Sequence, residues 1–192
     1  DSDRALLLDF QATLEIKPEK AIKLEKDALA QIENITADNA RLVSNLHANL
    51  GGLYRMNGHP DLAREHMEKS ISLLDQFNLL HINDSIPQIA NYAMFLTEQQ
   101  EPERGISELQ KLSGIIKEYH SDDCLDYAKV QETLGTIYLM TANLPQAKTH
   151  FKRAFKIYEK IWADEPEMIE AKYQEIQELY PQIGFCIGKN LS

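Results

Sequence analysis

The chain has 192 residues, a net charge of −10 at pH 7 and a sequence pI near 5.1. It has no run of Lys and Arg of the kind that nucleic-acid binders use. Its acidity therefore argues against DNA, RNA and anionic membranes as partners, and it favours basic or neutral ones. The apolar runs are only a few residues long, so neither a transmembrane segment nor a signal peptide is predicted.

Helix-breaking residues are scarce, with 8 Gly and 7 Pro, and this favours an all-α fold. Apolar spacing and turn residues predict four helix pairs and a last helix. We expect them at about 3–16 with 18–34, 37–57 with 60–77, 84–99 with 102–119, 122–142 with 144–163, and then 166–180. Pro18, Pro60 and Pro102 suit the first turn of a helix, where the missing N–H costs nothing. Ser121 with the two aspartates after it is expected to cap the seventh helix.

Three segments of the chain align without gaps at one spacing. They are 49–54, 91–96 and 133–138, and the offsets are 91 − 49 = 42 and 133 − 91 = 42. Further positions keep this register. Small residues recur at Gly51, Ala93, Gly135 and at Ala63, Gly105, Ala147, and large ones at Tyr54, Leu96, Tyr138 and at Met67, Leu109, Phe151. A repeat of this length predicts a solenoid of stacked helix pairs.

Close helix packing explains these residue types. Small residues let two antiparallel helices approach, and the large residues fill the space beside them. One such pair cannot bury its own apolar face, so the pairs must stack. The first repeat departs from the pattern, with Asp9 where a small residue is expected and Glu25 where a large apolar one is expected. We interpret it as a worn or capping repeat.

The order Leu-Gly-x-x-Tyr followed by Ala-x3-Phe-x2-Ala, as in 134–154, resembles the tetratricopeptide repeat (TPR). The 42-residue period and the segment 49–54 resemble the kinesin-light-chain type of that family. The resemblance implies a right-handed α-α superhelix, a TPR solenoid of about four repeats plus a C-terminal capping helix. Its repeats would cover about 2–36, 37–78, 79–120 and 121–163, with the capping helix at 166–180 and a tail at 181–192.

The first helix of each pair lines the concave face in such arrays. The resemblance implies that the Asn opening the 49–54 motif contacts the ligand backbone. Asn49 and Asn91 match that position, and Thr133 occupies it in the fourth repeat. An Asn that bonds only inside the array is the alternative. Helical spacing places further residues near the same face, namely Asn45, Arg55, Met94, Lys129 and Thr136.

No chemistry-bearing motif emerges from the sequence. The six histidines show no metal-binding spacing and no nucleophile stands beside a base, so we predict no catalytic residue, no metal and no cofactor. Cys124 and Cys186 lack any disulfide or metal pattern and read as reduced thiols of a cytoplasmic protein.

The predicted function is that of a non-catalytic protein-interaction scaffold, which binds a peptide or helix of a partner in its concave groove. A peptide-sensing regulatory domain of a larger bacterial signalling protein is the alternative. The chain is expected to be a piece of a longer protein, because the first helix lacks the upstream stretch of the others. Stacked repeats leave apolar ends, so two copies could form a homodimer through them.

Overall fold

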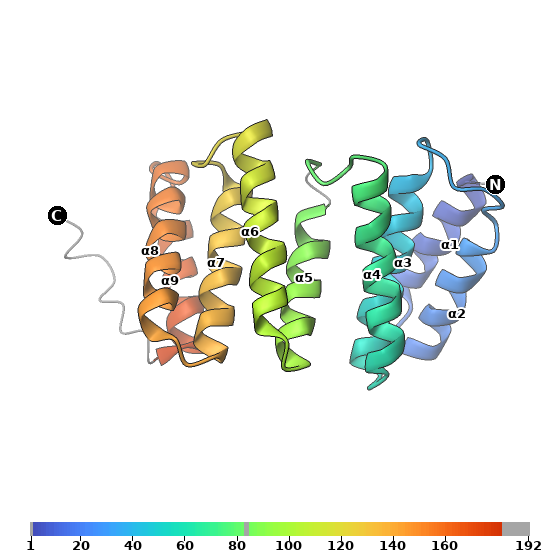
Figure 1. The fold of residues 1–192 in the computed structure, drawn as a ribbon, viewed down its shortest axis with the longest axis horizontal. Helices are drawn as coiled ribbons and strands as arrows, with labels where there is room; N and C mark the ends of the chain where they lie inside the picture. Colours follow the sequence, from blue (N-terminus) through green and yellow to red (C-terminus); the bar gives the residue numbers. More distant parts are fainter. Residues whose placement is uncertain (1, 83–84, 182–192) are drawn as a thin grey trace. The chain divides into compact units, whose positions relative to one another are not determined.

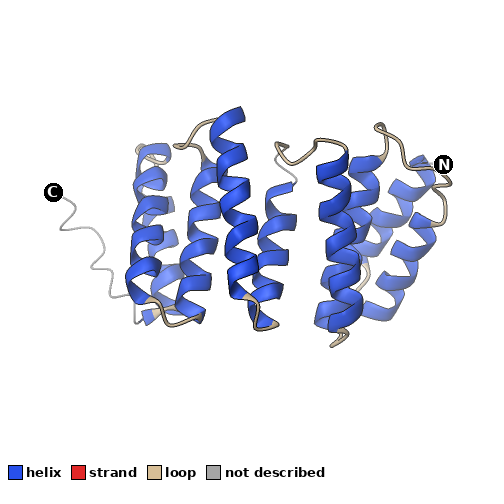
Figure 2. Ribbon diagram, in the orientation of Figure 1, coloured by secondary structure: helices blue, strands red, loops and turns tan. Residues whose placement is uncertain are grey.

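The computed structural model describes residues 2–82 and 85–181, and within these ranges the regular elements are α-helices with no strand (Figures 1 and 2). The predicted all-α repeat fold is confirmed. The helices are α1 (Ser2–Leu14), α2 (Pro18–Leu29), α3 (Ala40–Met56), α4 (Pro60–Gln76), α5 (Ser85–Glu98), α6 (Pro102–Tyr119), α7 (Leu125–Met140), α8 (Leu144–Ile161) and α9 (Pro166–Leu179).

The chain divides into two compact units, Asp1–Phe95 and Leu96–Ser192, and α5 runs through the division. In the first unit α1 packs on α2, α2 on α3 and α3 on α4. In the second unit α6 packs on α7 and α7 on α8. Consecutive helices in each unit are thus neighbours in space, as short connections require.

Several helix boundaries differ from those expected, most of all the end of α2. α2 ends at Leu29, and Asn39 makes hydrogen bonds within the loop that follows. The Asn39 side chain accepts a hydrogen bond from the Thr36 N–H (2.8 Å) and donates one to the Asn34 carbonyl (2.9 Å). The expected cap of α7 at Ser121 is wrong, since the N-cap is Cys124, whose Sγ accepts from the Tyr127 N–H at 3.5 Å.

The core repeats as the 42-residue register predicts. Leu50, Tyr92 and Leu134 hold equivalent positions and are all buried. A Cβ built on Gly51 would lie 2.6 Å from Met67 Cγ, and one on Gly135 would lie 2.8 Å from the Phe151 ring. The close approach of paired helices therefore depends on these two glycines.

The turn between paired helices also repeats. Gly58, Gln100 and Ala142 lie 42 residues apart and have φ values of 72°, 67° and 59°. The next residue in each turn donates its N–H back to the carbonyl five positions earlier, at 2.9, 2.8 and 2.7 Å. This is the six-to-one bond of a helix that closes with a left-handed residue.

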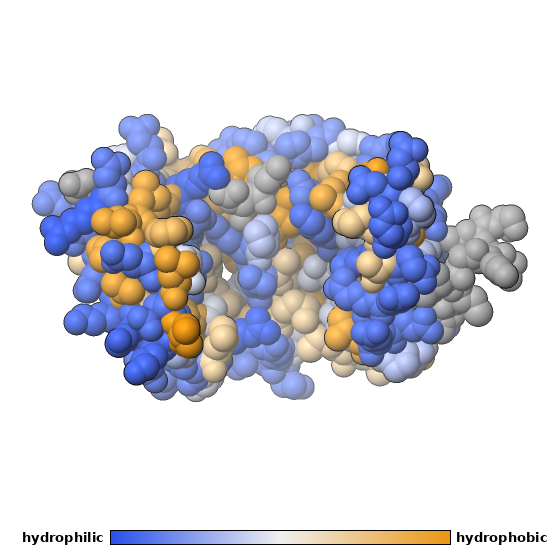
Figure 3. All heavy atoms as spheres, turned by 180° about the vertical axis from the view of Figure 1, so that it is seen from behind, coloured by the Kyte–Doolittle hydropathy of each residue, from blue (hydrophilic) through white to orange (hydrophobic). Residues whose placement is uncertain are grey.

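α1, the first helix of the array, carries exposed apolar residues, and orange patches are visible where it lies (Figure 3). They are Leu6, Leu7, Phe10 and Leu14, with exposed fractions of 50% to 68%. Pairing of two copies through such an end stays a prediction.

Candidate functional site: three pockets on the repeat helices

The first unit has a pocket of about 320 Å³ between α1, α3 and α5, which we call the amide pocket. Its lining residues are Asp9, Asn45, Ala48, Asn49, Pro87, Gln88 and Asn91. A second pocket of about 330 Å³, the carboxyl pocket, shares Ala48, Asn49 and Asn91 with it and reaches Glu25 on α2. Both pockets open on residues that the repeat register places on one face of the first helices.

A network of side-chain hydrogen bonds fixes two of the residues that line the amide pocket, Asn45 and Gln88. Gln88 donates its Nε2–H to Asn45 Oδ1 at 2.5 Å. The Gln88 carbonyl oxygen accepts from the buried hydroxyls of Ser44 and Ser70 at 2.9 and 2.6 Å. These bonds fix the orientation of both amides, so the pocket wall is pre-organised.

Asn49 joins the two pockets. Its Nδ2 donates to Asp9 Oδ1 at 2.9 Å and to Glu25 Oε1 at 3.1 Å. The amide nitrogen is therefore bonded inside the repeat array, while the carbonyl oxygen receives no hydrogen bond from the described residues. Asn91 is exposed at the rim of both pockets, where its amide can donate and accept at once.

Glu25 is a buried carboxyl group, with 1% of its surface exposed. Burial, the negative charge of Asp9 and a side-chain hydrogen bond with Asp9 together raise its pKa to about 8. The hydrogen bond from Asn49 acts in the opposite direction. Glu25 is consequently protonated at neutral pH in the free protein.

The second unit has a pocket of about 480 Å³ between α7, α8 and α9, which we call the terminal pocket. Its lining residues are Leu125, Lys129, Glu132, Thr133, Tyr158, Trp162, Met168, Ala171, Lys172 and Glu175. The Trp162 ring stacks on the Tyr158 ring, with centroids 4.8 Å apart. The pocket thus offers both an aromatic wall and charged groups, the usual mixture in a binding site.

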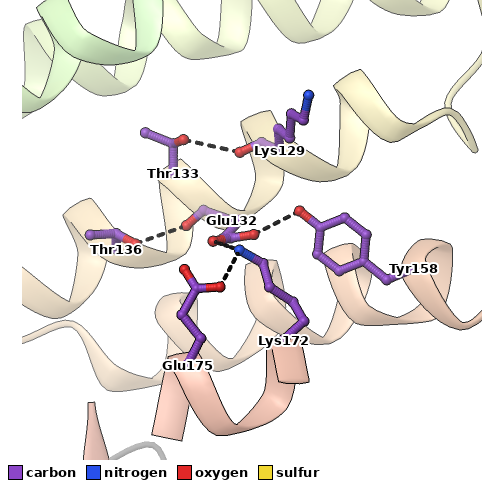
Figure 4. A network of polar contacts seen from close by, with 7 residues as sticks. All are labelled: Lys129, Glu132, Thr133, Thr136, Tyr158, Lys172 and Glu175. Carbon is purple, nitrogen blue, oxygen red and sulfur yellow. Dashed lines mark hydrogen bonds and ion pairs between the residues drawn. The ribbon is translucent and has the colours of Figure 1, made fainter. Parts of the chain in front are cut away.

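Glu132 holds the polar side of the terminal pocket together (Figure 4). The Tyr158 hydroxyl donates to Glu132 Oε2 at 2.6 Å, and Lys172 Nζ lies 2.8 Å from Oε1. Lys172 also pairs with Glu175 at 3.1 Å. Burial by itself lowers the pKa of Lys172, but the bonds and charges of Glu132 and Glu175 outweigh it and raise that pKa. Lys172 therefore stays charged inside the pocket.

Five of the eight predicted partner-binding residues line these pockets. Asn45, Asn49 and Asn91 line the amide pocket, and Lys129 and Thr133 line the terminal pocket. The remaining three, Arg55, Met94 and Thr136, line none of the three pockets.

The two threonines on α7 bond to their own helix (Figure 4). Thr133 Oγ1 donates to the Lys129 carbonyl at 3.0 Å, and Thr136 Oγ1 donates to the Glu132 carbonyl at 3.1 Å. Both hydroxyl hydrogens are therefore used within the helix, and a ligand role for all eight residues stays a prediction.

Other lining residues were not anticipated as ligand contacts. Trp162 directly follows α8 and Lys172 lies on α9, and neither was among the residues expected to contact a ligand. Asp9 and Glu25 appeared as departures of a worn repeat. Their separation is a signal that could have paired them, because 25 − 9 = 16 equals 67 − 51 = 16, the spacing of Gly51 and Met67.

The described residues contain no group of three or more His, Cys, Asp or Glu side chains that could hold a metal ion. Within the same residues, no helix is both long and apolar enough to cross a membrane. Cys186 lies outside them, as does most of the predicted tail at 181–192.

Residues 85–160 match the model of the tetratricopeptide repeat family. No protein among the curated proteins matches the chain. Among solved structures, the chain is similar to BtubC (BKLC) from P. vanneervenii, with a TM-score of 0.68 and 20% identity over 81% of this chain. It spans 61% of the length of that protein.

Two further similar structures are of a Podosopora anserina kinesin light chain with nearly identical TPR-like repeats. One, of a variant form, has a TM-score of 0.66 and 14% identity, and the match covers 76% of this chain and 69% of that one. The other has a TM-score of 0.62 and 14% identity, with 94% and 92% covered. At these identities the likeness shows the fold.

Proposed function

We propose that the chain is a non-catalytic scaffold that binds a peptide segment of a partner protein, because residues 85–160 match the tetratricopeptide repeat model and the fold is similar to that of kinesin-light-chain repeat arrays. Such repeats generally mediate contacts between proteins. Each unit offers its own position for a peptide, the amide pocket in the first and the terminal pocket in the second.

One observation carries this proposal. Asn49, Asn91 and Thr133 hold the same register position, and each of them lines a pocket. The two units thus offer pockets at equivalent places on their first helices. A repeated position that meets a repeated pocket suits a chain-like ligand, because a peptide also repeats its backbone groups at regular intervals.

The chemistry of the lining residues suits a peptide. The free carbonyl oxygen of Asn49 can accept a backbone N–H, and the exposed amide of Asn91 can bond both groups of one peptide unit. The exposed Lys129 ammonium at the terminal pocket can meet a carboxylate.

Asn91 provides the first test. Peptides selected from a displayed random library against the full chain are expected to lose about tenfold in affinity with Asn91→Ala, or about 1.4 kcal/mol. The double variant Asn49→Ala/Asn91→Ala loses more. Isothermal titration measures both. Gln110→Ala, an exposed residue of the second helix α6, is the matched control. Equal binding by wild type and double variant contradicts the proposal.

The terminal pocket gives a second prediction. Lys129→Ala is expected to weaken an acidic selected peptide by about 3- to 10-fold at low salt and less at about 0.5 M salt, because the contact is a screened surface charge. Affinity measured by fluorescence anisotropy at both ionic strengths checks this. Lys148→Ala, an exposed lysine of α8, is the control. A loss that does not depend on salt contradicts an ionic role.

A further inference from the structure

The first repeat replaces a packed core pair with two carboxyl groups. In other repeats the pair is Gly51 with Met67, and Gly135 with Phe151, and each glycine lies directly against its partner. Subtracting 42 from 51 and 67 gives Asp9 and Glu25. Position 9 has an acid in place of a small residue, and position 25 has an acid in place of a large apolar one. The substitution therefore affects both members of the contacting pair.

One atom of this pair lacks a partner. Glu25 Oε1 accepts from Asn49, whereas Glu25 Oε2 is buried and no described residue donates a hydrogen bond to it. A buried polar atom left unpaired costs roughly 1–3 kcal/mol, and more if it is charged. The buried hydroxyls of Ser44 and Ser70 in the next repeat, by contrast, are hydrogen-bonded. An oxygen that receives no donor from the surrounding side chains is able to accept one from a ligand in the pocket.

The surroundings decide the charge of that group. The carboxyl pocket is lined by Glu15 and Glu25 and by no Lys, Arg or His, and Asp9 lines the adjoining amide pocket. Asp9, Glu15 and Glu25 each accept one N–H through one oxygen, and of the three only Glu25 has a buried second oxygen without a donor. Because no three potential metal ligands cluster in the described part of the chain, the fitting donor is an organic cation.

We propose that the carboxyl pocket binds a basic side chain, Arg or Lys, of the partner peptide, with Asp9 and Glu25 as the acceptors of its N–H groups. This assignment rests on the scaffold function proposed above and names the chemistry of the ligand. The cation donates to Asp9 and, after a small rotation of the carboxyl group, to Glu25 Oε2. The net charge of −10 adds a long-range attraction for basic segments.

The raised pKa of Glu25 supports the same assignment. The groups that face it are the Asp9 carboxylate from α1 and the Asn49 amide from α3. Lys26, the next residue on α2, is not paired with Glu25, because its Nζ lies over the Tyr54 ring, 5.6 Å from the centroid. A bound cation supplies the positive charge that this carboxyl group lacks, and it favours the ionised form.

Small probes test the pocket without the partner. Titration of the isotope-labelled full chain with Nα-acetyl-arginine amide or Nα-acetyl-lysine methylamide, followed by NMR, is expected to shift the side-chain NH₂ signals of Asn49. We expect dissociation constants in the millimolar range. Nα-acetyl-citrulline amide has the same shape without the charge and is expected to bind at least tenfold more weakly. Alaninamide represents a free peptide N-terminus.

Two variants make the result specific. Asp9→Ala/Glu25→Leu carries the residue pair of the third repeat, Ala93 and Leu109, so it is expected to fold and to abolish the shifts. Glu25→Gln keeps the hydrogen bond to Asn49 and is expected to reduce affinity at least tenfold. Asp27→Ala removes an exposed acid of the same helix and is the control.

Several outcomes overturn the inference. They are equal shifts with the citrulline and arginine probes, unchanged binding by Asp9→Ala/Glu25→Leu, and binding of alaninamide alone. If the probes fail while selected peptides still depend on Asn91, the cation site is wrong and the scaffold function stands. If the probes bind but no peptide depends on Asn91, the cation site stands as a pocket and the groove assignment fails.

Discussion

The hairpins α3–α4 and α7–α8 are equivalent repeats in different units, and both contain a Tyr–His stack. Tyr54 stacks on His66 with ring centroids 5.4 Å apart, and Tyr138 stacks on His150 at 5.2 Å. The positions correspond, since 138 − 54 = 84 and 150 − 66 = 84, which is two periods of 42. The repeat thus conserves an aromatic contact inside the chain that was not visible from the family pattern.

The partner of the histidine differs between the two hairpins. His66 Nδ1 lies 2.8 Å from His47 Nδ1, whereas His150 Nδ1 lies 2.9 Å from Gln131 Oε1. An amide oxygen always accepts, but two facing imidazole nitrogens share one proton, so both rings cannot be charged. Both hairpins thus have a hydrogen bond at the histidine Nδ1, but its partner can be protonated in the first hairpin (His47) and not in the second (Gln131).

Burial lowers the pKa of both His66 and His150, and the first hairpin adds a second such histidine, His47, to this acid sensitivity. Burial and the neighbouring His66 and Lys69 lower the pKa of His47 to about 4. The ordinary pKa of histidine applies in the unfolded chain. A lowered pKa in the folded state means that the contribution of neutral His47 is fully present above pH 6.5 and is lost as pH falls towards 4.

His47→Gln, which copies Gln131, should have the largest effect on this comparison. Between pH 7 and pH 4.5 the variant is expected to lose about 2 kcal/mol less unfolding free energy than wild type, because Gln does not titrate. Urea unfolding at the two pH values measures it. The exposed His120→Gln should keep the wild-type slope. Identical slopes for wild type and His47→Gln mean that the His pair does not govern acid sensitivity.

The glycines at the helix crossings come next. Gly135→Ala places a Cβ 2.8 Å from the buried Phe151 ring and is expected to cost about 1–2 kcal/mol despite the better helix propensity of Ala. Adding Phe151→Leu makes the pair resemble Ala93 with Leu109 and should cost less than the two changes summed. Thermal and urea unfolding of the four proteins in this cycle decide it, and strict additivity contradicts the steric explanation.

The turns give the smallest expected effect. Gly58→Ala should destabilise the chain by about 1 kcal/mol, while Ala142→Gly should stabilise it by about 0.5 kcal/mol, since both positions have positive φ. Gly114→Ala, in open space on α6, is the control and should stabilise slightly. A loss of stability in Ala142→Gly shows that the left-handed turn is not strained there.

Much of the fold could be predicted because packing imposes a period on the sequence. Leu50 and Leu134 are both buried at equivalent positions, and Gly51 and Gly135 both allow the paired helix to approach closely. Boundaries such as the cap at Cys124 were missed, because cysteine seldom caps a helix and Ser121 nearby is the commoner choice. The repeat signal locates a helix well and its last turn poorly.

The candidate site could be predicted only in part. The register brought Asn49, Asn91 and Thr133 to pockets, since helical spacing decides which face a residue occupies. It gave no hint that the Asn49 amide nitrogen bonds Asp9 and Glu25, because that contact joins three helices. Such a contact depends on side-chain conformations, which a one-dimensional pattern does not contain.

The buried Glu25 carboxyl also makes cation binding measurable as a release of protons. Glu25 is protonated at neutral pH because its pKa is raised to about 8. A cation that binds beside it favours the ionised form, so we expect binding to release a proton to the solvent. Binding of a cation at the carboxyl pocket is therefore expected to acidify a weakly buffered solution. The binding enthalpies measured by calorimetry in phosphate and in Tris should differ in proportion to the ionisation enthalpies of the two buffers. An indicator dye could then report occupancy without any label on the protein.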